Sequence, residues 1–298
     1  MNWVAEWRNY FRYRAFSDEA WHQALLDSVK GRSRVPMPSF PTAEIQRSFV
    51  GTSDEDAINE AWRFYKLMSD QWKRNGIRIS PRSYVLDFGC GWGRFARMFL
   101  RNVPASHIYC ADTTDWPLSI CRDTGVPGKK VRLEPMPPSP LSSNQFDLVF
   151  AYSVFSHLSP KSHLAWRTEL GRVVKPDGLV FITTQARWFL DECRRYREHP
   201  EQISQRWHEE LAGSFLDYEA SMSQYDRGEF LFAADKPSVP PTETQISQRL
   251  GPDLYGQAVV PKGYFESQWS HDGFELIDFV ADRSVCEQAI AILRKRQP

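Results

Sequence analysis

The stretch that most constrains this chain is the glycine-rich segment at residues 84–95, which reads YVLDFGCGWGRF. A short apolar run is followed by three glycines that alternate with other residues, and then by residues compatible with a helix. This pattern predicts a strand, a tight turn and a helix start. Glycine tolerates positive φ and lets a ligand approach the backbone, and the first N–H groups of a helix bind carboxylates or phosphates. The segment therefore predicts an α/β unit with a ligand at its turn.

The spacing of the glycines separates two kinds of nucleotide-binding turn. A dinucleotide site has the pattern G-x-G-x-x-G, whereas here the glycines occupy positions 89, 91 and 93 and an arginine occupies position 94. Asp87 ends the apolar run just before the first glycine. A carboxylate at that point repels a pyrophosphate and attracts an amino group. The pattern therefore favours a ligand that carries an amine, and the alternative is an ordinary strand, turn and helix without a ligand.

Apolar runs and helix-like segments alternate after this turn. Such alternation predicts an α/β fold with a doubly wound, mostly parallel sheet of seven strands, the last two forming a hairpin. The first strand is expected to be followed by a helix through residues 95–99, and a helix with a capping box is expected over residues 53–74. The expected strands are residues 84–88, 107–111, 130–133, 146–151, 179–183, 274–280 and 288–293.

A second acidic residue follows the second expected strand. Asp112 lies about 20 positions beyond the glycine turn, and Thr113 follows it. An acidic residue at this offset accepts hydrogen bonds from both hydroxyls of a ribose. The alternative is an aspartate that only stabilises a turn or caps a helix. Two separate features of the sequence, at Asp87 and at Asp112, are thus consistent with one nucleoside ligand.

Three motifs carry a resemblance to a known family. Residues 86–91 have the form Leu-Asp-x-Gly-Cys-Gly, residues 153–158 read S-V-F-S-H-L after the fourth strand, and Lys-Pro-x-Gly precedes the fifth strand. Together they resemble class I S-adenosylmethionine-dependent methyltransferases, strongly over residues 50–184 and weakly over 261–296. The resemblance implies a Rossmann-like methyltransferase fold with S-adenosylmethionine as the cofactor. The residues that it places around the cofactor are Asp87, Gly89, Cys90, Gly91, Gly93, Asp112, Thr113, Glu134, Met136, Ala151 and Tyr152.

The resemblance also directs attention to His157, because the S-V-F-S-H-L segment faces the transferred methyl group in that family. An imidazole titrates near neutral pH, so His157 is the expected general base if the acceptor is a hydroxyl. The alternative is a structural histidine hydrogen-bonded at a helix start. His163, within the next helix, is expected at the surface. No group of His, Asp or Glu has the spacing of metal ligands, so no metal is expected.

The chain is expected to have an N-terminal helical extension, residues 1–50, and a methyltransferase domain, residues 51–298. Aromatic and arginine residues near the N-terminus, among them Trp7 and Phe11, predict a helix. We favour packing of its aromatic face onto the domain over contact with an anionic membrane. Residues 34–41, with three prolines, predict a linker. Residues 185–270 break the alternation. Residues 187–211 predict a charged helical stretch, and the long insert, irregular between the prolines and glycines of residues 213–260, is expected to act as a lid for substrate recognition.

Composition limits the partners. The 37 basic residues balance the 37 acidic residues, which removes the simplest electrostatic argument for a nucleic-acid partner. Five scattered cysteines without a close pair are typical of a reducing compartment. No apolar run approaches the roughly 18 residues of a membrane-spanning helix. We therefore expect a cytoplasmic protein without nucleic-acid partners or stable membrane insertion.

The expected function is methyl transfer from S-adenosylmethionine to a small-molecule or glycan acceptor, with a hydroxyl as the first choice. Two other classes stay open. One is a domain that binds the cofactor without catalysis, and the other is a nicotinamide-dependent oxidoreductase, which the missing G-x-G-x-x-G disfavours. The sequence does not distinguish O-, N- and C-methylation, and it gives no oligomeric state.

Overall fold

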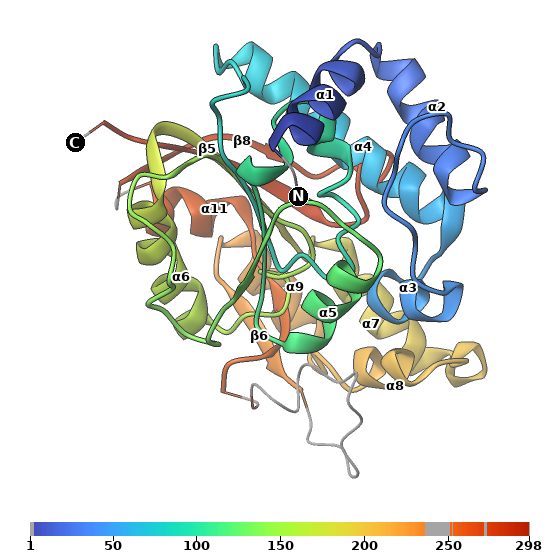
Figure 1. The fold of residues 1–298 in the computed structure, drawn as a ribbon. Helices are drawn as coiled ribbons and strands as arrows, with labels where there is room; N and C mark the ends of the chain where they lie inside the picture. Colours follow the sequence, from blue (N-terminus) through green and yellow to red (C-terminus); the bar gives the residue numbers. More distant parts are fainter. Residues whose placement is uncertain (1–2, 236–250, 252, 271–272, 298) are drawn as a thin grey trace. The chain divides into compact units, whose positions relative to one another are not determined.

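The computed structural model describes residues 3–235, 251, 253–270 and 273–297. Contacts divide the chain into two compact units. The first unit contains Met1–Glu134, Ser139–Ala151 and Val173–Val180. The second contains Pro135–Pro138, Tyr152–Arg172 and Phe181–Pro298. Figure 1 shows the elements of both, coloured along the sequence.

The strands join in a seven-stranded sheet with the order β3-β2-β1-β4-β5-β9-β8. Neighbours β1 and β2, β1 and β4, and β2 and β3 are parallel, whereas β8 and β9 are antiparallel. This arrangement confirms the expected doubly wound, mostly parallel sheet with a closing hairpin. The strands are β1 (Val85–Phe88), β2 (Ile108–Asp112), β3 (Lys129–Arg132), β4 (Phe146–Ala151), β5 (Val174–Thr184), β8 (Phe274–Val280) and β9 (Ala289–Lys295).

The strand β5 starts five residues earlier than the sequence predicts. Lys175 Nζ lies 2.7 Å from a carboxylate oxygen of Asp147, and the same oxygen accepts a hydrogen bond of 2.8 Å from the backbone N–H of Tyr84. These bonds hold the expected turn residues extended beside the start of β4. The Asp147 carboxylate thereby ties together the amino ends of three neighbouring strands.

The first unit also contains the N-terminal helices. They are α1 (Trp3–Arg14), α2 (Asp18–Val29), α3 (Ala43–Val50) and α4 (Asp54–Arg74), and α5 (Asp115–Asp123) follows β2 (Figure 1). The helix α4 spans the predicted residues, but the capping box is absent, because Ser53 Oγ bonds to Asp54 Oδ2 at 2.9 Å instead of capping the helix. Its apolar face is buried. Phe64 on α4 packs edge-on against Phe95 and Phe150, which fixes α4 to the core beside β4.

The helix expected directly after the glycine turn is not an α-helix. Residues 91–97 form successive turns, and a 3₁₀ helix, η1, covers only Met98–Arg101. The side chain of Arg97 explains the difference. Its Nε donates to the Gly93 carbonyl at 3.4 Å, and that carbonyl is the one a helical N–H of residue 97 would use. The prediction that helical N–H groups follow the turn is therefore wrong.

The aromatic face of α1 divides between core and solvent. Tyr10 and Tyr13 are buried, which confirms the expected packing, whereas 60% of Phe11 is exposed. The carboxylate of Glu6 anchors the helix by accepting bonds from the N–H and hydroxyl of Ser106 at 2.7 and 2.6 Å. Residues 34–41 lack regular structure, as predicted, but they pack into the unit rather than link two parts.

The second unit holds the segment that the sequence predicts to be an irregular insert. Two helices confirm the helical stretch predicted at residues 187–211, whereas the irregular course expected for the rest is wrong for the described residues, which contain a further helix and a two-stranded sheet. The segment has a small core of its own around Phe189, Leu211 and Met222. Residues 236–250 and 252 of this segment lie outside the described part. Besides β8 and β9, the described elements of the unit are α6 (Pro160–Val173), α7 (Trp188–Glu198), η3 (Pro200–Gln202), α8 (Arg206–Ala212), α9 (Tyr218–Asp226), β6 (Leu231–Ala234), β7 (Gly256–Val259), α11 (Lys262–Tyr264) and η4 (Phe265–Trp269) (Figure 1).

His163 on α6 is fully buried, so its expected place at the surface is wrong. Its Nε2 lies 3.2 Å from the Phe155 carbonyl, and aromatic rings surround it. Burial lowers its pKa to about 3, so the ring is neutral. In the described residues, no helix combines the length and the apolar character needed to cross a membrane.

Candidate cofactor site

The glycine turn after β1 depends on conformations that only glycine adopts easily. Gly89, Gly91 and Gly93 have φ of 77°, 50° and 76°. A Cβ on Gly93 would lie 2.6 Å from the side chain of Val126, so no larger residue fits there without movement. The N–H groups of Gly89 and Cys90 both bond to the Ala111 carbonyl, at 2.8 and 3.0 Å. The turn is thus fixed to the carboxyl end of β2.

The Asp87 carboxylate lies at the end of β1 without a hydrogen-bond partner for its Oδ2 atom, although the residue is only 1% exposed. Burial raises the pKa of Asp87 well above its ordinary value, and the nearby Cys121 and Asp112 groups add to this effect. Buried polar atoms in folded proteins almost always have a partner, so an unsatisfied carboxylate oxygen indicates a missing ligand group. A cationic amine supplies both the hydrogen bond and the compensating charge.

The Asp112 carboxylate lies on the other side of the turn, at the end of β2. Its Oδ2 accepts a bond of 3.2 Å from the N–H of Gly91, and its Oδ1 accepts one of 3.2 Å from the N–H of Thr114. Burial raises the pKa of Asp112 to about 6, and the bonds from Thr114, Gly91 and Thr113 oppose the rise. Each carboxylate oxygen can accept a further hydrogen bond. Asp112 is therefore oriented to receive two hydroxyls.

Cys90 and Cys121 complete the support of the turn. Their sulfur atoms lie 3.6 and 3.3 Å from the carbonyl oxygen of Gly91. The Gly91 peptide is therefore held at both ends, by Asp112 at its N–H and by thiols at its carbonyl. Glu134 is exposed two residues after β3, and Ala151 is the buried last residue of β4. The first unit thus brings Asp87, the three glycines, Cys90, Asp112 and Thr113 together, with Ala151 at the carboxyl end of β4 and Glu134 just beyond that of β3.

Phe49 is a site residue that the sequence did not reveal. A Cβ on Gly91 would lie 3.3 Å from its ring, and the ring stacks on Trp116 with centroids 4.8 Å apart and planes 15° apart. Phe49 belongs to the N-terminal extension, which lies outside the family resemblance. The motifs that carry the family resemblance therefore gave no indication of Phe49. The stacked pair forms an aromatic wall beside the turn, of the kind on which a nucleobase packs.

The remaining predicted residues belong to the second unit. Met136 accepts a bond of 3.5 Å from Ser162 Oγ at its sulfur, and the Tyr152 hydroxyl accepts one of 3.7 Å from the Cys286 thiol. Ser153, next to Tyr152, has a positive φ of 57°. Gln288 on the approach to β9 supports this bend, because its amide donates to Ser153 Oγ at 3.2 Å. No sequence motif indicates this role of Gln288, since the two residues lie far apart in the chain.

His157 is half-buried and has a defined tautomer. Its Nδ1 lies 3.0 Å from the Gly256 carbonyl, and its ring stacks on Tyr255 with centroids 5.0 Å apart and planes 7° apart. A carbonyl only accepts hydrogen bonds, so Nδ1 carries the proton and the neutral ring has its lone pair on Nε2. Burial lowers the pKa of His157, so the ring is neutral at physiological pH. Nε2 can therefore accept a proton from a bound group.

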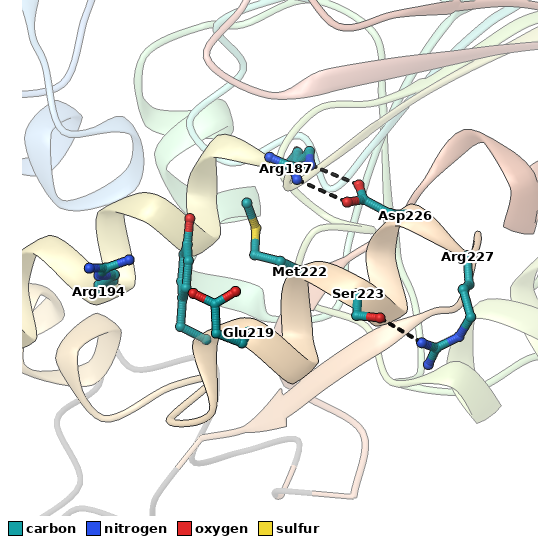
Figure 2. A pocket seen from close by; sticks show the side chains of 8 residues that line it. Arg187, Arg194, Glu219, Met222, Ser223, Asp226 and Arg227 are labelled. Carbon is teal, nitrogen blue, oxygen red and sulfur yellow. Dashed lines mark hydrogen bonds and ion pairs between the residues drawn. The ribbon is translucent and has the colours of Figure 1, made fainter.

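An open pocket on the insert is lined by three arginines, as Figure 2 shows. Its volume is about 690 Å³. Each arginine already has a carboxylate partner: Asp226 for Arg187 at 2.8 Å, Glu198 for Arg194 at 2.7 Å and Glu229 for Arg227 at 2.7 Å. An anion would have to displace these ion pairs, so the pocket is not a preformed anion site. Among the described residues, no three His, Cys, Asp or Glu side chains gather to hold a metal ion.

Comparisons with known proteins agree with this geometry. Residues 85–178 match the methyltransferase domain family. A glycine/sarcosine/dimethylglycine N-methyltransferase from Actinopolyspora halophila is 28% identical over 145 residues, which cover 47% of this chain and 24% of that protein. A cyclopropane-fatty-acyl-phospholipid synthase from Escherichia coli K12 is 25% identical over 111 residues, which cover 36% of this chain and 28% of that protein. The chain thus spans about a quarter of the length of these curated relatives.

The similarity extends to solved structures. A structure from Listeria monocytogenes, assigned to the S-adenosylmethionine-dependent methyltransferases, is 9% identical with a TM-score of 0.50, and the match covers 80% of this chain and 98% of that one. At this identity the likeness shows the fold alone. The sheet order and the two acidic positions around the glycine turn define a Rossmann-like methyltransferase domain. Residues 85–178 are thus similar in sequence to the methyltransferase domain family, and the described residues have the Rossmann-like methyltransferase fold.

Proposed function

We propose that this protein is a methyltransferase that uses S-adenosylmethionine to methylate a hydroxyl of a small-molecule acceptor, free or within a glycan. The observation that carries the proposal is the buried Asp87 carboxylate with an unsatisfied oxygen, placed beside Asp112 at the glycine turn. An amine and a ribose diol are the groups that these two carboxylates fit. S-adenosylmethionine has both, and when bound it supplies an activated methyl group on a sulfonium.

The first unit holds the cofactor. Asp87 receives the amino group, Asp112 receives the ribose hydroxyls, and Phe49 with Trp116 packs against the base. Gly91 adopts a positive φ and has no side chain of its own, so its backbone can approach the ligand closely. Glu134, Met136, Ala151 and Tyr152 remain proposed cofactor contacts. These residues bind and orient, and orientation is itself a large part of the acceleration in a displacement reaction.

The second unit acts on the acceptor. His157 Nε2 removes the proton of the acceptor hydroxyl, while the Gly256 carbonyl holds the ring in the basic tautomer. The lowered pKa keeps the ring neutral and ready to accept that proton. The aromatic side chains of residues 185–270, including Tyr255 against the His157 ring, form the acceptor-recognition segment. The five free thiols support work in a reducing compartment.

An amine acceptor is the second candidate, because one relative is named as an N-methyltransferase. A neutral amine already has its lone pair and needs no base. The two candidates therefore differ in their dependence on His157.

The test uses the full chain with S-adenosylmethionine that carries a labelled methyl group. A panel of sugars, phenols, alcohols and amines is offered, and mass spectrometry detects labelled products. The proposal expects a labelled hydroxyl compound. Methylation of amines alone contradicts the proposed hydroxyl acceptor. Cofactor binding without any labelled product across the panel contradicts the proposed catalysis and favours a domain that only binds the cofactor.

A further inference from the structure

A second cavity lies in the first unit, away from the glycine turn. Its volume is about 460 Å³, within the range of small-molecule sites. One wall comes from α1 and another from the segment at residues 36–39. The opposite walls include Ala105, just before β2, and Pro127, just before β3. The cavity therefore borders the amino ends of β2 and β3, whereas Asp87 and Asp112 lie at the carboxyl ends of their strands.

The N-terminal extension creates this cavity. Its contribution is Tyr10 and Tyr13 of α1, both buried, together with the proline-containing segment that the sequence predicts to be a linker. The segment is fixed in place. Ser39 donates from its N–H and its hydroxyl to the Thr124 carbonyl at 2.9 and 3.1 Å. A wall held by such bonds is preformed, so a ligand meets little ordering cost.

The charged side chains that line the cavity are all acidic. Its lining contains two carboxylates, Glu6 and Asp123, and no lysine, arginine or histidine. Neither carboxylate has a cationic partner within the described residues. Glu6 is 8% exposed, and its Oε1 is held by Ser106, which fixes the orientation of the carboxylate. A cation inside the cavity would supply the charge partner that the carboxylates of Glu6 and Asp123 lack.

The apolar part of the lining selects the rest of the ligand. Two tyrosine rings and Leu100 lie against the cavity together with its prolines. Aromatic rings attract cations as well as aromatic groups. We propose that this cavity is a second ligand site, distinct from the cofactor site, which takes a small organic cation with an aromatic body.

The wall is also joined to the cofactor turn. The Arg97 guanidinium bonds to the carbonyls of Pro38 and Ser39 at 3.5 and 3.4 Å, and its Nε bonds to Gly93 at 3.4 Å. One side chain thus contacts both the wall of the second site and the glycine turn. The two sites share a support but no lining residue, so both ligands bind at once.

The test is calorimetry on the full chain with three indole probes that differ only in their side-chain end group. Tryptamine ends in an ammonium, tryptophol in a hydroxyl and 3-indolepropionate in a carboxylate. S-adenosylhomocysteine is present at saturation to fill the cofactor turn. We expect one tryptamine per chain and affinities at least tenfold weaker for the other two probes. Equal binding of all three, or displacement of tryptamine by S-adenosylhomocysteine, overturns the proposal.

Matched variants locate the binding. Ala105→Leu fills the cavity and is expected to reduce tryptamine affinity at least tenfold, with retained S-adenosylhomocysteine binding as the check of folding. Asp123→Asn, at an exposed position, is expected to weaken tryptamine binding several-fold. Glu44→Gln removes an exposed carboxylate of α3 outside the cavity and is expected to change nothing. Wild-type affinity in both Ala105→Leu and Asp123→Asn overturns the site.

Discussion

At the scale of single residues, two acidic side chains carry the argument, and the sequence predicted both. Asp87 and Asp112 were identified from their offsets to the glycines, because offset determines which strand end a residue occupies in a parallel sheet. The sequence could not predict the pKa values of these two carboxylates. Burial raises the pKa of Asp112 to about 6, and burial depends on how the chain packs around the end of β2, which the offset does not give.

The raised pKa of Asp112 makes cofactor binding depend on pH. The ribose hydroxyls donate to the ionised carboxylate, so binding requires loss of a proton that the free protein holds below about pH 6. We expect the Asp112 contribution to the affinity for S-adenosylhomocysteine to be constant above that pH and to fall by up to tenfold per pH unit below it. Calorimetry between pH 5 and 8 measures this. In Asp112→Asn the contribution of this group should vanish and the affinity should be weak throughout.

His157 gives a second prediction at this scale. His157→Ala is expected to lower the methyl-transfer rate by roughly 10²–10⁴, the usual range for a general base. Cofactor affinity should hardly change, because the effect belongs to the transition state. Since burial lowers the pKa of His157, the wild-type rate should be flat at neutral pH and fall only in acid below pH 6.5. A His157→Asn variant with near-normal rate would show that the ring only positions the acceptor.

At the scale of elements, patterns of apolar residues predicted the strands well and the connections poorly. The strands β1 to β4 begin within one residue of the prediction, because their buried runs have few alternatives. The helix after the glycine turn was predicted from propensity and is absent, since the buried Arg97 takes the Gly93 carbonyl. In the insert, the helical stretch at residues 187–211 was predicted and corresponds to α7 and α8. The helix α9 and the β6–β7 pair were missed, because the glycines and prolines of residues 213–260 suggested an irregular segment.

Arg97 is therefore expected to matter for the whole turn. Its guanidinium lies 4.0 Å from the centre of the Phe40 ring and bonds to three carbonyls, and burial lowers its pKa to about 9. Arg97→Ala removes these contacts and leaves buried carbonyls unpaired, which should cost about 3 kcal/mol or more of unfolding free energy. Chemical denaturation measures this. The exposed Arg32→Ala serves as the control and should stay within about 0.5 kcal/mol of wild type.

At the scale of the whole molecule, the family match covers residues 85–178, and the N-terminal extension and the insert lie outside it. The extension adds Phe49 and the second cavity, and the insert has a core of its own. No sequence motif identifies these parts, because they arise from packing between residues that lie far apart in the sequence. The fold was therefore largely predictable, and the positions of the candidate site residues in part, whereas the helix and the strand pair within residues 213–260 were not.

The division into two units predicts separable effects. Met222 lies in the core of the insert, and Met222→Ala should destabilise that core by about 2–4 kcal/mol. Methyl transfer should fall as the insert loosens, while the affinity for S-adenosylhomocysteine should stay at its wild-type value. Hydrogen exchange of α7 and α9 together with calorimetry measures both. Equal loss of cofactor binding in the folded variant would mean that the insert supports the cofactor site.

The central claim is that the unsatisfied Asp87 carboxylate binds the amino group of S-adenosylmethionine. Calorimetry with S-adenosylhomocysteine on wild type, Asp87→Asn and Asp147→Asn tests it most directly, since Asp147 is a carboxylate of the same sheet that already has partners. We expect one ligand per chain for wild type and Asp147→Asn, an affinity weaker by about 1.5–3 kcal/mol for Asp87→Asn, and no binding of NAD. Unchanged affinity in Asp87→Asn, or binding of NAD in place of S-adenosylhomocysteine, would contradict the account.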